Sequence, residues 1–295
     1  MARSFIDRDG HHAHALPYIP QPFQRGRLGG VAHPALVDFL RDLPRIDALP
    51  VLPDTVVYMQ RPNLVREVAL PASLEVPWSH LVVKRFGWRG RQHYALSPLK
   101  RSRAMKAYAT ACHLLSYHLD TPLPLGVFEE RHRGFVKYNV LATEAIENYV
   151  TLRQYRESLS GDPQGVSQEP PVEIDDVLQL AADYARRVHD CGIWHRDMVL
   201  SNFLMTGQSG QRRLYLVDLN RAYRLPKVPM LLRAFDIARM DWQSWHMRFV
   251  VLYCADRYPV ALMQAMVWGY GYWRRLRLWT RPVRRWLKRV VGIAS

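Results

Sequence analysis

The sequence has few cysteines and no long apolar run. Its three cysteines, Cys112, Cys191 and Cys254, are widely spaced and form no CxxC pair. An odd number of scattered thiols excludes a complete disulfide framework and a cysteine-based zinc cluster, and it favours a reducing compartment. No stretch reaches roughly 18 uninterrupted apolar residues, and the N-terminal residues contain no apolar signal core. We therefore expect a cytoplasmic protein with neither a secretory signal nor a spanning helix.

Acidic residues are also scarce relative to basic ones. The 295-residue chain has 41 Lys and Arg against 26 Asp and Glu, which gives a formal net charge of +15. Such a balance favours anionic partners, such as nucleotides, phosphosugars, nucleic acid or an acidic membrane surface, without choosing among them. Apolar residues make up 48% of the chain, which is enough for a packed core and argues against disorder.

The first half of the chain predicts a small antiparallel sheet. Residues 1–48 are rich in Pro, Gly and His, contain one short helical pattern, and are expected to form an N-terminal extension. Three runs rich in Val and Tyr then predict strands: DTVVYMQ, LVREVAL and HLVVKRF. Residues 97–119 predict one helix, because apolar residues recur there at intervals of three and four. The segment GFVKYNVLATEAI predicts two further strand segments.

The second half predicts mainly helices. Residues 157–171 form a loop by composition, and a helix is expected over about 174–190, with Asp175 as its candidate cap and Gly192 after its end. The segment RAFDIARMDWQSWHMRF and the stretch of about 257–273 also predict helices. Strands followed by helices indicate an α+β protein.

The strongest signal is a set of polar residues with a defined spacing. His195, Arg196 and Asp197 are followed, after four further residues, by Asn202, and Asp218 ends the apolar run LYLVD sixteen residues later. These residues and their spacing resemble the HRD-x4-N catalytic loop and the metal-binding aspartate of protein kinases. The resemblance implies phosphoryl transfer, in which an acceptor hydroxyl must be oriented and the developing charge neutralised.

The same resemblance implies a role for each residue. Asp197 is the expected catalytic base, which orients the acceptor hydroxyl and accepts its proton. The amide oxygen of Asn202 and the carboxylate of Asp218 are the expected Mg²⁺ ligands. His195 and Arg196 are expected to hold the loop rather than to react.

Candidate nucleotide-binding residues lie upstream. Lys84 closes the strand HLVVK, where a kinase-like sheet offers its phosphate-binding lysine, although a solvated strand end would look the same. Backbone groups of Glu144, Ala145 and Ile146 are placed to pair with an adenine edge if this segment is the hinge between lobes; an ordinary strand end is the alternative. Asp236 stands where kinases place an aspartate that supports the catalytic loop, and a surface carboxylate is its alternative reading.

Within the kinase-like superfamily, the sequence is similar to the bacterial lipopolysaccharide kinases of the Kdo/WaaP type. The similarity rests on GIWHRDMVLSNFLM, LYLVDLNRA and HLVVKRF and covers roughly residues 50–245. It implies a two-lobed fold with a small antiparallel-sheet lobe at 49–146, a larger helical lobe at 147–273 and a tail at 274–295. It also implies an ATP- and Mg²⁺-dependent kinase that acts on an inner-core sugar, Kdo or heptose, in an anionic glycolipid or phosphosugar.

The sequence departs from the kinase pattern at three places. RPNLVREV replaces the glycine-rich loop before Lys84. No Asp or Glu occurs between Lys84 and Asp120, so the helix that normally supplies a glutamate to orient the lysine cannot supply one here. Asn220 replaces the glycine of the DFG motif, although Asn tolerates left-handed backbone geometry better than most residues.

Residues 274–289 carry eight basic residues and no acidic one, interleaved with Trp and Leu. This composition is typical of an interfacial segment that contacts anionic lipid, which would place the protein peripherally at the cytoplasmic face of the inner membrane. A solvated basic tail or one that binds nucleic acid is the alternative, but nucleic-acid motifs are otherwise absent and we expect no such partner.

Two other functions remain open at this stage. The first is a kinase of the same fold with a protein or small-molecule acceptor. The second is a non-catalytic pseudokinase that binds a partner, which the missing helix glutamate would explain. Retention of Asp197, Asn202 and Asp218 favours catalysis over the binding module.

Overall fold

The structure is a computed structural model that describes residues 16–42, 57–59, 63–87, 94, 97–160, 172–208 and 210–280. The chain separates into two compact units, each described here by itself. Unit 1 comprises Met1–Tyr149 and Tyr215–Ala222, and unit 2 comprises Val150–Leu214 and Tyr223–Ser295. Strands dominate the first unit and helices the second, as the α+β prediction required.

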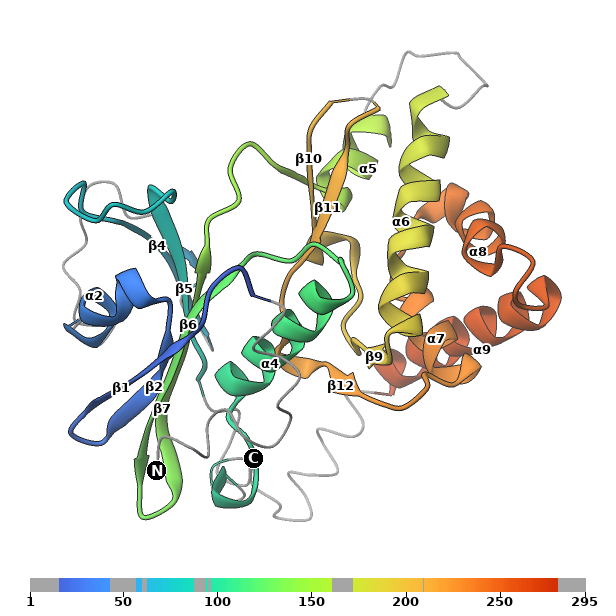
Figure 1. The fold of residues 1–295 in the computed structure, drawn as a ribbon. Helices are drawn as coiled ribbons and strands as arrows, with labels where there is room; N and C mark the ends of the chain where they lie inside the picture. Colours follow the sequence, from blue (N-terminus) through green and yellow to red (C-terminus); the bar gives the residue numbers. More distant parts are fainter. Residues whose placement is uncertain are drawn as a thin grey trace. The chain divides into compact units, whose positions relative to one another are not determined.

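Unit 1 is built on a seven-stranded antiparallel sheet with the strand order β1-β2-β6-β7-β5-β4-β3 (Figure 1). Its strands are β1 (Gln21–Arg25), β2 (Leu28–Ala32), β3 (Val57–Met59), β4 (Leu64–Ala69), β5 (His80–Arg85), β6 (Pro124–His132) and β7 (Phe135–Glu144). Helix α2 (Val37–Asp42) follows the 3-10 turn η2 (Pro34–Leu36), and its Leu40 joins the core of the sheet.

The three strands predicted around residues 57–85 are present as β3, β4 and β5. The segment predicted as two strand pieces is the single strand β7, and its partner β6 was not predicted. Part of the expected N-terminal extension also pairs with the sheet through β2, where Gly30 allows a close approach. A Cβ atom on Gly30 would lie 2.1 Å from the carbonyl oxygen of Val127 on β6. Gly30 is therefore required by the close packing of β2 on β6, and it does not mark a loop.

Helix α4 (Arg103–Ser116) begins six residues later than predicted, because Ser102 caps it by accepting a hydrogen bond from the Met105 N–H at 3.2 Å. The preceding residues Ser97–Leu99 form a separate 3-10 turn, η4. Small residues such as Ala107 and Ala111 are buried on α4, which lets the helix pack closely on β6, β7 and the 3-10 turn η6 (Leu219–Arg221).

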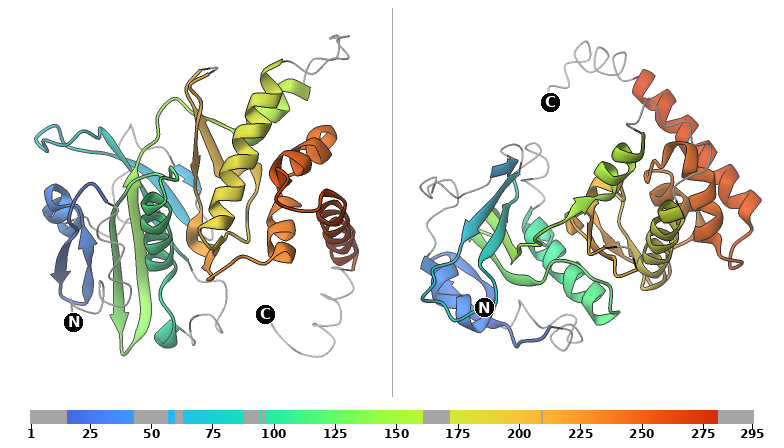
Figure 2. Two further views of the ribbon diagram at one scale, coloured as in Figure 1. Left: turned by 45° about the vertical axis from the view of Figure 1, so that its right-hand side comes forward. Right: turned by 90° about the horizontal axis from the view of Figure 1, so that it is seen from above.

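Unit 2 contains the helices α5 (Leu152–Ser160), α6 (Val172–Asp190), α7 (Met230–Ile237), α8 (His246–Cys254) and α9 (Val260–Trp279) (Figure 2). Its short strands are β8 (Val150–Thr151), β9 (Ile193–Trp194), β10 (Phe203–Thr206) and β12 (Tyr223–Arg224), with β12 paired to β9. β11 (Arg213–Leu216) runs across the boundary between the units and lies beside β10 in the sheet order. The 3-10 turns are η5 (Leu200–Asn202) and η7 (Gln243–Trp245).

Two local predictions in unit 2 were wrong. Helix α6 begins at Val172, so Asp175 lies inside the helix and forms an ion pair with Arg248 instead of capping. Residues 157–160 belong to α5 rather than to a loop, and residues 161–171 lie outside the described part of the chain. The predicted end of α6 is correct: Gly192 adopts a left-handed φ of 84° two residues after Asp190.

Candidate active site

Lys84 forms an ion pair with Asp218 inside unit 1. Strand β5 places Lys84 between Val65 of β4 and Leu141 of β7, and its Nζ donates to Asp218 Oδ1. The two side chains are only 19% and 29% exposed, so solvent screens the pair less than it would at an open surface. Asp218 thus supplies the counter-charge that the sequence had left unassigned for Lys84.

The backbone around Asp218 is held from both sides. Asp218 itself adopts the left-handed conformation, with φ 61°, and the side-chain amide of Asn220 donates to the same Oδ1. The sequence had suggested that the unusual geometry would fall on Asn220, but that residue lies in η6. Just before the aspartate, the Thr121 hydroxyl donates to the Leu216 carbonyl at 2.7 Å. These contacts fix the position and direction of the Asp218 carboxylate.

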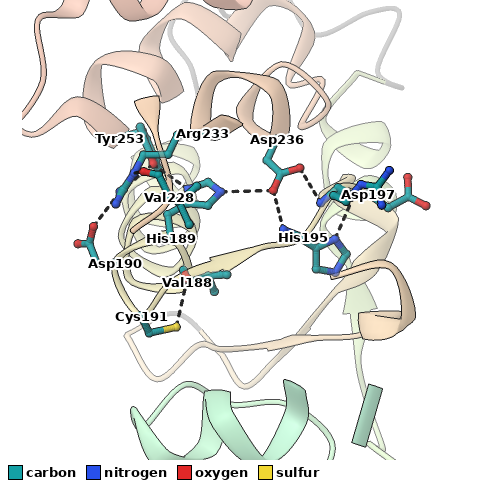
Figure 3. A network of polar contacts seen from close by, with 11 residues as sticks. Val188, His189, Asp190, Cys191, His195, Asp197, Val228, Arg233, Asp236 and Tyr253 are labelled. Carbon is teal, nitrogen blue, oxygen red and sulfur yellow. Dashed lines mark hydrogen bonds and ion pairs between the residues drawn. The ribbon is translucent and has the colours of Figure 1, made fainter. Parts of the chain in front are cut away.

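The predicted catalytic loop of unit 2 is anchored by Asp236, a fully buried carboxylate on α7 (Figure 3). Asp236 accepts hydrogen bonds from the backbone N–H groups of His195 at 2.8 Å and Arg196 at 2.9 Å. Arg196 has a left-handed φ of 67°, which turns two successive N–H groups toward one carboxylate. The structure therefore places Asp236 in the supporting position that the sequence suggested.

The side chains of the loop hold its backbone in one conformation. The buried His195 accepts a hydrogen bond from the Asp197 N–H at its Nδ1, 3.2 Å away, and Asn202 Nδ2 donates to the Asp197 carbonyl at 2.8 Å. The Arg196 guanidinium lies 5.1 Å from the ring centre of Trp194 and 4.9 Å from that of Tyr223. These contacts hold the backbone of the loop around Asp197.

Arg239 contacts the carboxylate of Asp197 and was not found from the sequence. Its guanidinium forms an ion pair with Asp197 Oδ1, lies 5.8 Å from the ring centre of Phe235, and donates to the Tyr270 hydroxyl at 3.5 Å. Burial by itself lowers the pKa of Arg239, but hydrogen bonds and charge interactions with Tyr270 and Asp197 raise it above its ordinary value. The guanidinium is therefore charged. Its position three residues after Asp236, just beyond the end of α7, is the signal that could have revealed it.

A buried polar network lies behind Asp236 (Figure 3). His189 Nε2 is 3.4 Å from Asp236 Oδ2, and His189 Nδ1 is 2.7 Å from the Tyr253 hydroxyl. Arg233 donates to Asp190 at 2.7 Å and to the Val228 carbonyl at 2.9 Å. Burial lowers the pKa of His189, although Asp236 acts in the opposite direction. The neutral histidine thus bridges Asp236 to α8.

This network predicts a pH-dependent stability. The unfolded chain protonates His189 near the ordinary histidine pKa of about 6.5, whereas burial in the folded chain lowers that pKa and disfavours the proton. The stabilisation is therefore full above about pH 6.5 and is lost as the pH falls below it. We expect the free energy of unfolding, measured with urea, to fall by up to about 1.4 kcal/mol per pH unit for this residue.

The matched comparison for this prediction is His189→Gln, whose slope between pH 7 and pH 5 should be shallower even if the variant is less stable overall. Part of the slope should remain, because burial also lowers the pKa of His246. If the two proteins show the same slope, His189 is not the group that takes up the proton.

The predicted hinge residues lie at the end of β7. The Glu144 N–H donates to the Leu123 carbonyl at 3.0 Å, and the Ala145 N–H donates to the His80 carbonyl at 3.4 Å. The Glu144 carboxylate accepts from the Leu123 N–H at 2.8 Å, and burial raises its pKa. The N–H groups of Glu144 and Ala145 are thus both used within unit 1. The Ile146 N–H is the remaining donor of the predicted hinge that could pair with an adenine edge.

Comparison with known proteins places this site in a family. A model of the lipopolysaccharide kinase (Kdo/WaaP) family matches residues 79–246, which is more than half of the chain and includes every residue from Lys84 to Arg239 discussed above. The chain belongs to the lipopolysaccharide kinase (Kdo/WaaP) family. The resemblance inferred from the sequence motifs is therefore confirmed.

One curated relative is the lipopolysaccharide core heptose(I) kinase WaaP of Escherichia coli (strain K12). It is 26% identical over 140 residues, a match that covers 45% of this chain and 51% of WaaP. The matched segment thus spans about half the length of that relative.

Two solved structures are similar to this chain, and the first of them shows its fold. A structure of WaaP in complex with acyl carrier protein matches with a TM-score of 0.54 at 18% identity, covering 75% of this chain and 86% of the WaaP chain. A Rio2 kinase from Chaetomium thermophilum, solved as an ADP/Mg²⁺-phosphoaspartate complex, matches with a TM-score of 0.41 at 14% identity and covers 77% and 71% of the two chains. The match to the WaaP chain confirms the predicted α+β, protein-kinase-like fold.

Proposed function

We propose that this chain is an ATP-dependent kinase that phosphorylates a sugar hydroxyl of the lipopolysaccharide inner core, either Kdo or heptose. The observation that carries the proposal is the anchored loop of unit 2. A buried carboxylate, Asp236, holds two backbone N–H groups, and the adjacent Asp197 keeps a partly exposed carboxylate. Family membership then narrows phosphoryl transfer to this class of acceptor.

The residues present fit Mg²⁺ and a nucleotide. Asp218 and Asn202 offer carboxylate and amide oxygens, the hard ligands that Mg²⁺ prefers, and Asn202 uses its Nδ2 for the Asp197 carbonyl, so its Oδ1 is the atom it can offer to a metal. When bound, Mg²⁺ would neutralise charge on the phosphates. Lys84 carries a positive charge beside Asp218 and would bind phosphate oxygens. The Ile146 N–H would pair with the adenine edge, because the N–H of Glu144 is already bonded to the Leu123 carbonyl.

Asp197 would act as the base for the acceptor. His195 and Asn202 fix its backbone, and Arg239 fixes its carboxylate. Asp197 would therefore lose little conformational entropy when a hydroxyl binds. The carboxylate would accept the hydroxyl proton as the oxygen attacks the transferred phosphoryl group. Arg196 and His195 would act only by holding the loop.

The acceptor is proposed from charge as well as from family. The net charge of +15 favours a phosphorylated or otherwise anionic glycolipid. The name of the Escherichia coli relative favours heptose over Kdo. We further propose peripheral contact with an anionic membrane through residues 274–289, of which 274–279 lie in α9 and 281–289 lie outside the described part of the chain. No helix in the described part is long and apolar enough to span a bilayer.

The decisive experiment is transfer of label from γ-labelled ATP, with Mg²⁺, to purified lipopolysaccharide that lacks core phosphate. Label should enter the glycolipid with the unmodified protein and not with Asp197→Ala. Mapping the labelled sugar then separates heptose from Kdo. If label enters only a protein or a small molecule, the acceptor is wrong; if MgATP binds and no label moves to any acceptor, the chain is a pseudokinase.

Arg239 gives a further prediction about the same site. Arg239→Gln should lower kcat roughly tenfold to a hundredfold, because a hydrogen bond to a charged group contributes about 1.5–3 kcal/mol. The dissociation constant for MgATP should change little. Arg239→Lys should recover part of the loss by restoring the positive charge. Single-turnover rates and nucleotide titrations check this, and a Lys variant that is as slow as the Gln variant would show that the charge does not matter.

A further inference from the structure

Helix α9 presents an exposed apolar face. Trp268 is 69% exposed and Tyr272 is 72% exposed, although large aromatic side chains are usually covered. Leu262 and Leu276, near the two ends of the helix, are 47% and 45% exposed. With Trp273, which is 46% exposed, five large apolar side chains along one helix exceed the scattered exposure that is normal for a protein surface.

Three of the exposed residues share one side of α9. Trp268, Tyr272 and Leu276 follow one another at intervals of four, which places them along one line of the helix. The opposite side is buried: Met263 is 0% exposed and Val267 is 4% exposed. Figure 2 shows α9, in dark red, along the edge of unit 2, and its contacts are with α7 and α8. The helix is therefore amphipathic, and no described part of the chain covers its outer apolar side.

Apolar surface continues from α9 onto α7. An open apolar cavity of about 260 Å³ lies between these helices and is lined by Leu231, Leu232, Phe235, Met266, Tyr270 and Trp273. Leu231, at its rim, is 64% exposed. The uncovered area thus spans two helices of unit 2.

Charge selects the kind of partner that would cover this face. Helix α9 contains no Asp or Glu, and Arg274 and Arg275 near its C-terminal end are exposed. Arg275 lies seven residues after Trp268, so it stands on the same side of the helix two turns later. Trp and Tyr rings favour the boundary between headgroups and acyl chains, where arginines meet lipid phosphates.

We propose that the outer face of α9, defined by Trp268, Tyr272, Arg275 and Leu276, docks on an anionic phospholipid surface. The helix lies in the plane of the interface, with its rings among the headgroups and Arg275 on lipid phosphate. The proposal builds on the membrane contact in the proposed function, but it assigns the apolar anchor to residues upstream of most of the basic segment. It is tested without nucleotide or acceptor, so failure of the kinase assay would leave this result standing.

The experiment measures partition of the full chain onto vesicles of phosphatidylcholine, with and without phosphatidylglycerol, by flotation. The unmodified protein should bind the anionic vesicles, and added salt should weaken binding. Replacing both Trp268 and Tyr272 by Ser should lower the partition coefficient roughly tenfold or more, because the variant lacks the two rings that the membrane would bury. Arg275→Glu should lower it roughly tenfold on the anionic vesicles only.

Matched controls lie in unit 1. Ile19→Ser removes an exposed apolar side chain, and Arg133→Glu reverses an exposed charge; neither should change partition. Circular dichroism verifies folding, and Trp268→Phe should retain binding. The proposal is overturned if the unmodified protein does not bind anionic vesicles, or if the Trp268/Tyr272 variant binds them equally well. It is also overturned if this face mediates a concentration-dependent dimer that the same variant disrupts.

Discussion

Asp197→Ala is expected to lower turnover by roughly 10²- to 10⁴-fold, the range typical of a positioned general base. The substitution removes the carboxylate that would accept the acceptor proton and leaves the loop anchored, because His195 and Arg196 bond to Asp236 through their backbone. Affinity for MgATP should be nearly unchanged, since Lys84 and Asp218 are untouched. Turnover of label into the glycolipid and a separate nucleotide titration measure the two quantities.

Asp176→Ala is the matched control for Asp197→Ala, because Asp176 is an exposed carboxylate on α6 outside the anchored loop. It should retain full turnover. A thermal melt of each variant separates loss of chemistry from loss of folding. Turnover that survives Asp197→Ala would remove Asp197 from the base role and direct attention to another acceptor of the proton.

Asp218→Asn is expected to weaken binding of MgATP roughly tenfold to a hundredfold, the equivalent of one or two charge-assisted contacts. The carboxylate would be both a metal ligand and the counter-charge of Lys84, and an amide offers only one oxygen and no charge. Titrating Mg²⁺ at fixed ATP, with the thermal midpoint as readout, should show that the stabilisation now needs more metal.

Lys84→Met provides the comparison for Asp218→Asn. It should also weaken nucleotide binding, because a phosphate contact is lost, but the Mg²⁺ dependence that remains should resemble that of the unmodified protein. Identical Mg²⁺ titrations for Asp218→Asn and the unmodified protein would exclude Asp218 from the metal site.

The sequence contained the residues of the site but not all of their partners. His195, Asp197, Asn202 and Asp218 could be found because kinase-like chemistry requires their types and spacing within a short stretch. The Lys84–Asp218 pair joins residues 134 positions apart, and no periodicity or local motif encodes such a distance. The missing acid between Lys84 and Asp120 indicated that a partner was needed, but not where it would be.

The fold was predictable where local patterns were strong. Strand β5 and helix α6 have regular apolar spacing, and both were found. Strand β6 was missed because it begins with Pro124, contains Gly126 and ends in charged residues, all of which indicate a loop when read locally. Only pairing with β2 and β7 makes this segment a strand. Tertiary contacts overrode local propensity there.

The pairing of Lys84 with Asp218 also bears on how such an enzyme can be controlled. In protein kinases, a movable helix carries the glutamate for this lysine, and shifting the helix turns activity on or off. Helix α4 carries no acidic residue, so the partner of Lys84 comes from the residue before η6 and not from a helix that could swing away. A displacement of α4 would reach the ion pair only through the packing of α4 on η6.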